Sequence, residues 1–167
     1  MAIMAKSNKT DFTPAPEGLH PAVCVDVIDL GMVTTQWGES HQIKIRWQLE
    51  DDDPKTRRPY LVQRQFRNSL HEKSSLRPLL ESWRGKKFTE EELKGFDLER
   101  LLGANCQLQI IHRITGEGGT FANVQAIVAC GKRQTKLVAR DYVREKDRIK
   151  NANAISESEE IDDSVPF

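Results

Sequence analysis

The middle of the chain alternates apolar and polar residues with the period of two that is typical of half-buried β-strands. The alternation is clearest in residues 41–50, HQIKIRWQLE, where the apolar positions are Ile43, Ile45, Trp47 and Leu49. The residues between them are polar, so this strand is expected to bury one face and to expose the other.

Four further segments have strand patterns: residues 19–35, 60–68, 105–115 and 120–130. The apolar positions expected to share a face within each segment are Val23, Val25 and Val27; Val62 and Phe66; Cys106, Leu108, Ile110 and Ile114; and Ala122, Val124, Ala126 and Val128. Gly31 lies inside the first segment, where a strand of this length is expected to bend.

Helix signals separate the third strand segment from the fourth. Ser75 can cap a helix that ends at Gly85 and that buries three leucines and Trp83 on one side. The spacing of a capping box occurs twice, in Ser69 with Glu72 and in Thr89 with Glu92. A short helical turn is expected within residues 97–103. This region is therefore predicted to form a helical insertion.

The order of elements is three strands, a helical insertion and two strands. This order predicts an all-β protein, a five-stranded Greek-key barrel of the OB-fold type with helices between strands three and four. Other small β-barrels with a helical insertion share the order. In an OB-fold the binding face is the outer surface of the second and third strands, bordered by the loops after the first and fourth strands.

Composition agrees with a globular domain that carries polar extensions. The 167 residues are 38% hydrophobic and 30% charged, and no apolar run is long enough to span a bilayer. Residues 1–18 contain no signal-peptide core and are expected to form a flexible arm, so we expect a cytoplasmic protein. The three cysteines, Cys24, Cys106 and Cys130, fit a reducing compartment. The folded domain is predicted over residues 19–130.

The net charge of zero conceals two blocks of opposite charge near the C-terminus. Residues 131–150 contain eight basic and three acidic residues, whereas residues 151–167 contain five acids and no base. Such blocks are usually solvated and unstructured. A functional interpretation is that residues 131–150 bind a polyanion and that the disordered acidic tail, residues 151–167, competes with it.

No pattern in the sequence predicts a catalytic, metal or cofactor site. The four histidines are scattered, and none has zinc-ligand spacing with a cysteine. The triplet Asp51, Asp52 and Asp53 could hold Mg²⁺, as in a small nuclease, but acids followed by Pro54 are typical of a turn. We therefore expect a protein that is not an enzyme.

The predicted binding face does carry basic and aromatic residues. Single-stranded nucleic acid is bound by cations that follow the phosphates and by rings that stack on bases. Lys44 and Arg46 point outward from the second strand by alternation. The full set of candidate nucleic-acid-binding residues is Trp37, Lys44, Arg46, Arg57, Arg58, Tyr60, Arg67, Arg113 and Phe121.

The chain ends in SEEIDDSVPF, which resembles the acidic tip of bacterial single-stranded-DNA-binding proteins. The matching positions, with Val165 in place of isoleucine, are Asp162, Asp163, Val165, Pro166 and Phe167. Ser164 replaces an acid of that motif. A terminal phenylalanine can fill an apolar pocket while its carboxylate pairs with a cation, so the resemblance implies that replication, recombination or repair proteins bind this tip.

Residues 69–103, followed by FANVQAIV, resemble phage-encoded OB-fold single-stranded-DNA-binding proteins, and this resemblance spans residues 17–130. It implies sequence-tolerant binding and protection of single-stranded DNA during phage replication or recombination, in the cytoplasm of a bacterial host. The preference for DNA over RNA rests on it. The body has no motif match to the bacterial host family, so self-association stays open. The rival interpretations are a recombination mediator or protein-interaction adaptor, and the nuclease described above.

Overall fold

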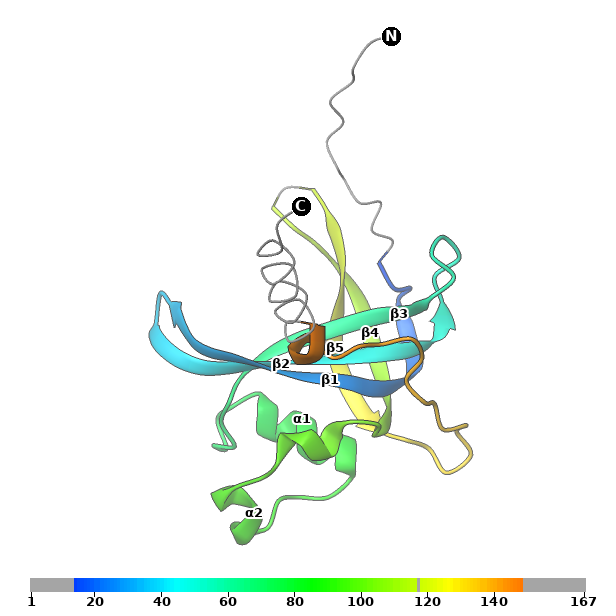
Figure 1. Cartoon of the computed structure of the whole chain (residues 1–167). Coiled ribbons are helices and arrows are strands. Elements are labelled where there is room, and N and C mark those ends of the chain that lie inside the picture. Colours follow the sequence, from blue (N-terminus) through cyan, green and yellow to red (C-terminus); the bar gives the residue numbers. More distant parts are fainter. Residues whose placement is uncertain (1–13, 117, 149–167) are drawn as a thin grey trace, which may run out of the picture.

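The computed structural model describes residues 14–116 and 118–148, which form a mostly β protein (Figure 1). Five antiparallel strands form one sheet in the order β3-β2-β1-β4-β5. The strands are β1 (Gly18–Thr35), β2 (Gly38–Asp52), β3 (Pro59–Arg67), β4 (Asn105–Ile114) and β5 (Thr120–Ala129). Their bounds agree closely with the five segments expected from the hydrophobic pattern, and the sheet is barrel-like.

Strand β1 is long enough to pair with two neighbours. Residues 18–23 pair with β4, whereas residues 22–35 pair with β2. The strand bends at Gly31, where the register with β2 shifts and the backbone has a φ of 67°. This left-handed conformation has little steric cost for glycine. The bend expected from the sequence is confirmed, and beyond it β1 and β2 continue as a projecting hairpin (Figure 1).

Bulges reverse the inward face of two strands. Between Cys24 and Asp26 the register of β1 shifts, so Cys24 and Val27 contact the core whereas Val23 and Asp26 lie on the outer face with β2's polar residues. The expectation that Val23 and Val27 share a face is therefore wrong. A bulged strand has one extra residue, and this residue switches the alternation that follows.

The same effect occurs in β5. Its register with β4 shifts between Gln109 and Ile110, so Val124 and Ile127 are buried while Val128 is exposed. The predicted common face of Val124 and Val128 is wrong for this reason. In β4 the first three predicted apolar positions are buried, but Ile114 is 80% exposed because it lies at the far end of the hairpin.

The core lies between the inner face of the sheet and helix α1 (Leu76–Arg84). The four apolar residues of the 41–50 segment are all buried, as the alternation predicts. Leu76, Leu79 and Leu80 pack against them, and the rings of Trp47 and Trp83 lie 5.9 Å apart. Helix α1 therefore fills one end of the barrel-like sheet.

The helical insertion follows most of its sequence signals. Helix α1 starts after Ser75, as expected, but the Ser75 side chain makes no capping hydrogen bond. The helix ends at Gly85 in a left-handed conformation, and Thr89 and Glu92 form a complete capping box at the start of α2 (Glu90–Lys94). A 3₁₀ turn, η1 (Leu98–Leu101), follows. The spacing of Ser69 and Glu72 is not followed by a helix, because the Ser69 hydroxyl accepts a hydrogen bond from the His71 amide in a turn.

The sheet is not closed by backbone hydrogen bonds between β3 and β5, which lie at its opposite edges. Side chains of β3 and of helix α1 bind β5 instead. The Arg64 guanidinium lies over the Phe66 ring at 5.0 Å and donates to the Val124 carbonyl at 3.2 Å. The Ser82 hydroxyl of α1 donates to the Ile127 carbonyl at 2.6 Å. These contacts use carbonyl groups of β5 that an edge strand would otherwise leave unpaired.

The N-terminal flank of the domain differs from expectation where it is described. Ala15 is only 4% exposed, and its carbonyl lies 2.6 Å from His112 Nε2, so residues 14–17 pack on β4 although they fall in the predicted flexible arm. The rest of that arm, residues 1–13, lies outside the described residues.

No helix within residues 14–116 and 118–148 is long and apolar enough to cross a membrane.

The basic segment after β5 returns across the sheet. Residues 137–148, called the strap below, lie over the outer face of β1 and β2 (Figure 1). Side-chain amides hold its backbone in two reciprocal pairs: Asn105 with Leu137 at 2.6 and 3.0 Å, and Gln48 with Arg140 at 2.8 and 2.7 Å. The expectation of an unstructured segment is therefore wrong for this part of residues 131–150, although most of its side chains are exposed.

Candidate nucleic-acid interface

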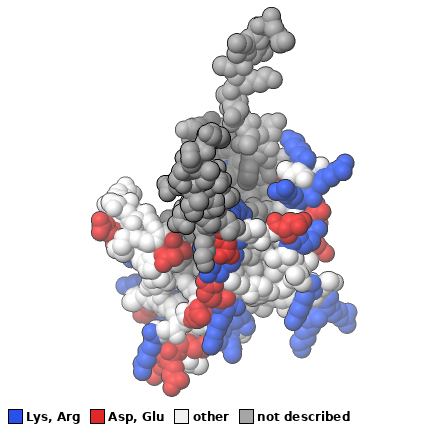
Figure 2. Space-filling view, in the orientation of Figure 1, with Lys and Arg blue, Asp and Glu red and all other residues white. Residues whose placement is uncertain are grey.

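A groove of about 690 Å³ runs along β3 and between the sheet and the strap. We call it the arginine groove because four arginines line it: Arg46, Arg58, Arg140 and Arg148. They come from β2, the β2–β3 loop and the strap, with Tyr142 of the strap and Phe121 of β5 beside them. Figure 2 shows basic side chains gathered over the β2–β3 loop at the upper right of the molecule.

Arg46 lies at the base of the groove, where alternation along β2 points it outward. Its Nε donates to Gln63 on β3 at 2.8 Å, and its Nη1 donates to the Tyr142 hydroxyl at 3.2 Å. The same Nη1 lies 2.9 Å from the Glu145 carboxylate. Burial alone would lower the pKa of Arg46, but Tyr142 and the nearby carboxylates raise it. The guanidinium therefore stays charged.

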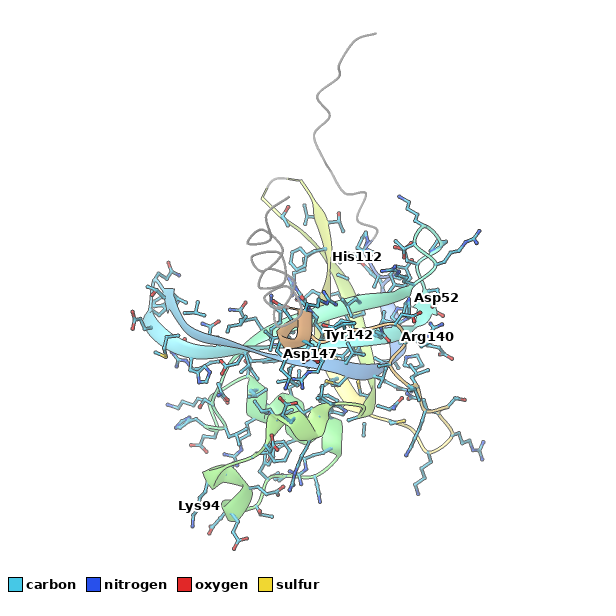
Figure 3. The ribbon with its side chains drawn as sticks, viewed as in Figure 1. Asp52, Lys94, His112, Arg140, Tyr142 and Asp147 are labelled. Atoms are coloured by element: carbon cyan, nitrogen blue, oxygen red, sulfur yellow. The ribbon has the colours of Figure 1, made fainter. Side chains whose placement is uncertain are left out.

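The strap supplies the opposite side of the groove (Figure 3). The Arg148 guanidinium lies over the Tyr142 ring at 5.0 Å, a distance at which cation–π attraction is effective. Arg140 forms an ion pair with Asp52 at the end of β2. Its side chain is still 52% exposed, so it lies within reach of a ligand.

Asp26 anchors the strap from below. Its carboxylate is 1% exposed and accepts hydrogen bonds from the Tyr142 hydroxyl at 2.7 Å, the Glu145 amide at 2.9 Å and Arg144 Nε at 3.2 Å. Burial would raise the pKa of this carboxyl, but these three donors outweigh it and lower the pKa. A charged carboxylate is thus retained in the interior because it is fully hydrogen-bonded.

Arg144 extends this anchor to the helical insertion. Its two terminal nitrogens donate to the Glu99 carboxylate of η1 at 2.7 and 3.1 Å. One of these nitrogens also donates to the Val27 carbonyl at 3.1 Å. The strap is therefore held by both the sheet and η1, and this double attachment sets the position of Tyr142 and Arg148.

Three of the nine predicted binding residues come together in the groove in the way the sequence suggests. Arg46 and Phe121 point outward from their strands, and Arg58 lies in the β2–β3 loop. Phe121 is 41% exposed and is paired in register with Arg113 of β4, as expected. Arg113 itself does not line the groove.

Tyr60 requires a correction. The sequence predicts that it lies at the connection between the second and third strands, as a ring able to stack on a base. It lies instead inside β3, on the face of Val62 and Phe66, and is 9% exposed. Its edge lines the groove, but a ring buried to this extent does not offer a face for stacking. The period of two that placed Val62 in the core also applies to Tyr60.

The remaining candidates lie elsewhere on the surface. Trp37 is 84% exposed at the turn between β1 and β2, and it does not line the groove. Arg57 is exposed in the β2–β3 loop with a left-handed φ of 59°. Lys44 points outward on β2 and is half-buried, and Arg67 is exposed at the end of β3. The candidates therefore divide into a cluster and several dispersed residues.

The sequence pattern did not identify Arg140, Tyr142 and Arg148 individually, or Asp26 as their support. One signal was present in β1, where Asp26 interrupts the apolar run VCVDVI. An acid inside a buried strand indicates a polar partner. Its partners are 116 to 119 residues away along the chain, so the sequence alone did not indicate which they were.

The three acids of the β2–β3 region do not converge on one point. Asp51 lies 3.7 Å from His20, Asp52 pairs with Arg140, and Asp53 accepts a hydrogen bond from the Lys55 amide at 2.9 Å. No group of three or more metal-ligating side chains occurs within the described ranges 14–116 and 118–148. This arrangement gives no support to the nuclease interpretation.

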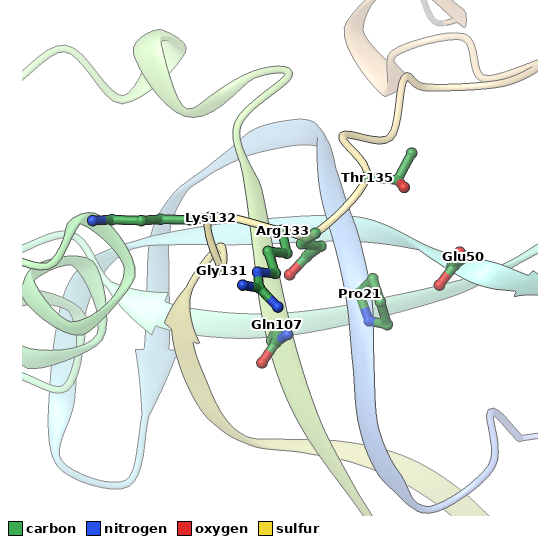
Figure 4. Close-up of a pocket in the computed structure, with 8 residues that line it drawn as sticks. Pro21, Glu50, Gln107, Gly131, Lys132, Arg133 and Thr135 are labelled. Carbon is green, nitrogen blue, oxygen red and sulfur yellow. The ribbon is translucent and has the colours of Figure 1, made fainter.

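A second hollow of about 530 Å³ lies at the turn after β5 (Figure 4). Lys132 and Arg133 border it, together with Glu50 of β2 and Gln107 of β4. It has no aromatic ring in its lining, and the arginine groove is the stronger candidate for nucleic acid. The acidic tip, residues 162–167, lies outside the described residues.

Comparisons with known proteins add no identification of this site. No protein-family model matches the chain, and no curated protein matches it.

Proposed function

We propose that this protein binds single-stranded DNA without sequence specificity, and that the arginine groove is its binding site. The observation that carries the proposal is the convergence of four arginines with Tyr142 and Phe121 over the outer side of β2 and β3. Arginines follow the phosphate backbone, and exposed aromatic faces stack on bases of any kind. No base-specific arrangement is needed for such binding.

The fold supports the same proposal. Five antiparallel strands with helices between β3 and β4 are the elements of an OB-fold, and the groove runs along β2 and β3, the strands whose outer face binds oligonucleotides in that fold. Its borders are the β2–β3 loop and the strap rather than the loops after the first and fourth strands. Assignment to the OB-fold, and kinship with phage-encoded single-stranded-DNA-binding proteins, are part of the proposal. The protein would coat and protect single strands during replication or recombination, without catalysing a reaction.

The C-terminal tip completes the proposed function. Asp162, Asp163, Val165, Pro166 and Phe167 would recruit replication, recombination or repair proteins to the coated strand. Acidic residues steer the tip toward basic partner surfaces, and the final ring supplies an apolar contact. Recruitment would therefore use a segment that is separate in sequence from the groove.

The test is the double substitution Arg58→Ala/Arg148→Ala, measured by fluorescence anisotropy of labelled oligo(dT) across a salt series. Affinity should fall on the order of tenfold at low salt, and the salt slope should decrease by about 0.7 for each phosphate that the variant no longer neutralises. The matched control is Lys86→Ala/Arg100→Ala, which removes two exposed cations that do not line the groove. Equal losses of affinity in the two variants, or equal affinity of the native protein for duplex DNA, would contradict the proposal.

A further inference from the structure

Two of the four arginines in the groove are paired with carboxylates of the chain itself. Arg46 Nη1 lies 2.9 Å from Glu145 Oε2, and Arg140 pairs with Asp52. The Arg46 side chain is 15% exposed, whereas the Glu145 side chain is 38% exposed. A guanidinium at the base of the groove is thus covered by a carboxylate that still contacts solvent.

The backbone and the side chain of Glu145 have separate partners. Its amide donates to the buried Asp26 carboxylate at 2.9 Å, while its own carboxylate contacts Arg46. Tyr142 and Arg144 bind the same Asp26 carboxylate. The hydrogen bonds to Asp26 hold the backbone of the strap and so place the Glu145 side chain beside Arg46. The Glu145 carboxylate itself takes no part in these hydrogen bonds.

We propose that Glu145 competes internally with a nucleic-acid phosphate for Arg46, an inference that rests on the proposed function. Carboxylate and phosphate oxygens both accept charge-assisted hydrogen bonds from a guanidinium, so one can replace the other. Glu145 can rotate toward solvent without leaving a buried charge unpaired, because the entering phosphate takes its place. The strap thereby lowers the affinity of the groove for a single strand.

The direct test compares Glu145→Gln with the native protein by anisotropy of labelled oligo(dT). The substitution keeps the backbone amide that donates to Asp26, and it removes the side-chain charge that neutralises Arg46. We expect binding to tighten about two- to fivefold at low salt, the range of a partly exposed ion pair. The salt slope should become steeper by about 0.7, because one more phosphate is neutralised.

The matched control is Asp147→Asn. Asp147 is exposed on the same strap, two residues beyond Glu145 (Figure 3). It differs from Glu145 in that it does not pair with Arg46. Both substitutions change the net charge equally, so an effect of net charge alone would be the same in both. A gain in Glu145→Gln no greater than that in Asp147→Asn would overturn the inference.

A double-mutant cycle tests whether the gain passes through Arg46. Glu145→Gln should give no gain in an Arg46→Gln background, and a gain that persists there would overturn the inference. Failure of the native protein to bind oligo(dT) would refute the proposed function itself. Native binding without a specific Glu145 effect would refute only the internal competition, so the two failures are distinguishable.

Discussion

The arginine groove and the projecting β1–β2 hairpin both carry residues typical of nucleic-acid binding, yet they are built in opposite ways. The hairpin, residues 31–42, is one continuous stretch of chain, and its Trp37 is 84% exposed. The groove combines a strand, a loop and a strap, and its arginines are largely hydrogen-bonded or paired. The hairpin therefore offers exposure, whereas the groove offers positioned charge.

This difference indicates which region is suited to hold a strand. Binding through a residue such as Trp37 requires that an exposed side chain be ordered at an entropic cost. Arg46 is already held by Gln63 and Tyr142, so little further ordering is needed. Prepositioned side chains retain more of their interaction energy upon binding. Four substitutions at three positions can test this comparison.

The largest expected effect is on stability, from Asp26→Ala. Removal of the buried carboxylate leaves the Tyr142 hydroxyl, the Glu145 amide and one Arg144 nitrogen without their acceptor. We expect a decrease of about 3 kcal/mol in the free energy of unfolding, measured by urea denaturation. Oligo(dT) affinity should fall as well, because the strap carries Tyr142 and Arg148.

The control for this substitution is Asp29→Ala, in the same strand next to the hairpin. Asp29 binds His41 at 2.5 Å and the Gly31 amide at 2.8 Å, but its side chain is 70% exposed. Its removal should cost less than about 1 kcal/mol. Similar costs at Asp26 and Asp29 would mean that the strap is not anchored by the buried carboxylate.

A smaller effect is expected for Trp37→Ala, which should change oligo(dT) affinity less than twofold because Trp37 does not line the groove. The intrinsic fluorescence gives a second measurement. Trp47 and Trp83 are 0% and 6% exposed, so any quenching by bound strand would have to arise at Trp37. Strong quenching would show that the strand extends onto the hairpin. A decrease in affinity in Trp37→Ala equal to that in Arg58→Ala/Arg148→Ala would show the same.

The smallest effect concerns pH. The pKa of Asp26 is lowered in the folded protein, so its contribution to stability is complete above the unfolded pKa of about 3.9 and is lost as the pH falls through the folded pKa. The decrease in stability between pH 7 and pH 3 should therefore be smaller in Asp26→Asn than in the native protein. Urea denaturation at the two pH values measures the decrease in each protein. An equal decrease in Asp26→Asn and in the native protein would contradict the assigned cause of the lowered Asp26 pKa.

Much of the sheet and its core could be predicted from local patterns. The alternation in residues 41–50 identified the inward face of β2, and Gly31, Gly85 and the Thr89–Glu92 capping box marked a bend, a helix end and a helix start. Each signal involves neighbouring residues only. For the same reason the alternation failed where a bulge inserted one residue, as it did within β1 and β5.

The candidate site was predictable only in part. Parity along the strands placed Arg46 and Phe121 on the outer surface, and the charge count identified the basic segment that contains Arg140 and Arg148. Nothing local indicated that this segment would cross β1 and β2. Its path depends on pairs such as Gln48 with Arg140, which are 92 residues apart along the chain.

The sequence by itself determined the strands, the end of α1 at Gly85, the capping box of α2, the inward face of β2 and the separation of a basic segment from an acidic tail. Only the tertiary structure decided that the basic segment becomes one side of the arginine groove, and that Glu145 rather than solvent neutralises Arg46. The physical reason is that secondary structure follows from local periodicity and capping, whereas a buried charge such as Asp26 selects its partners by distance in space.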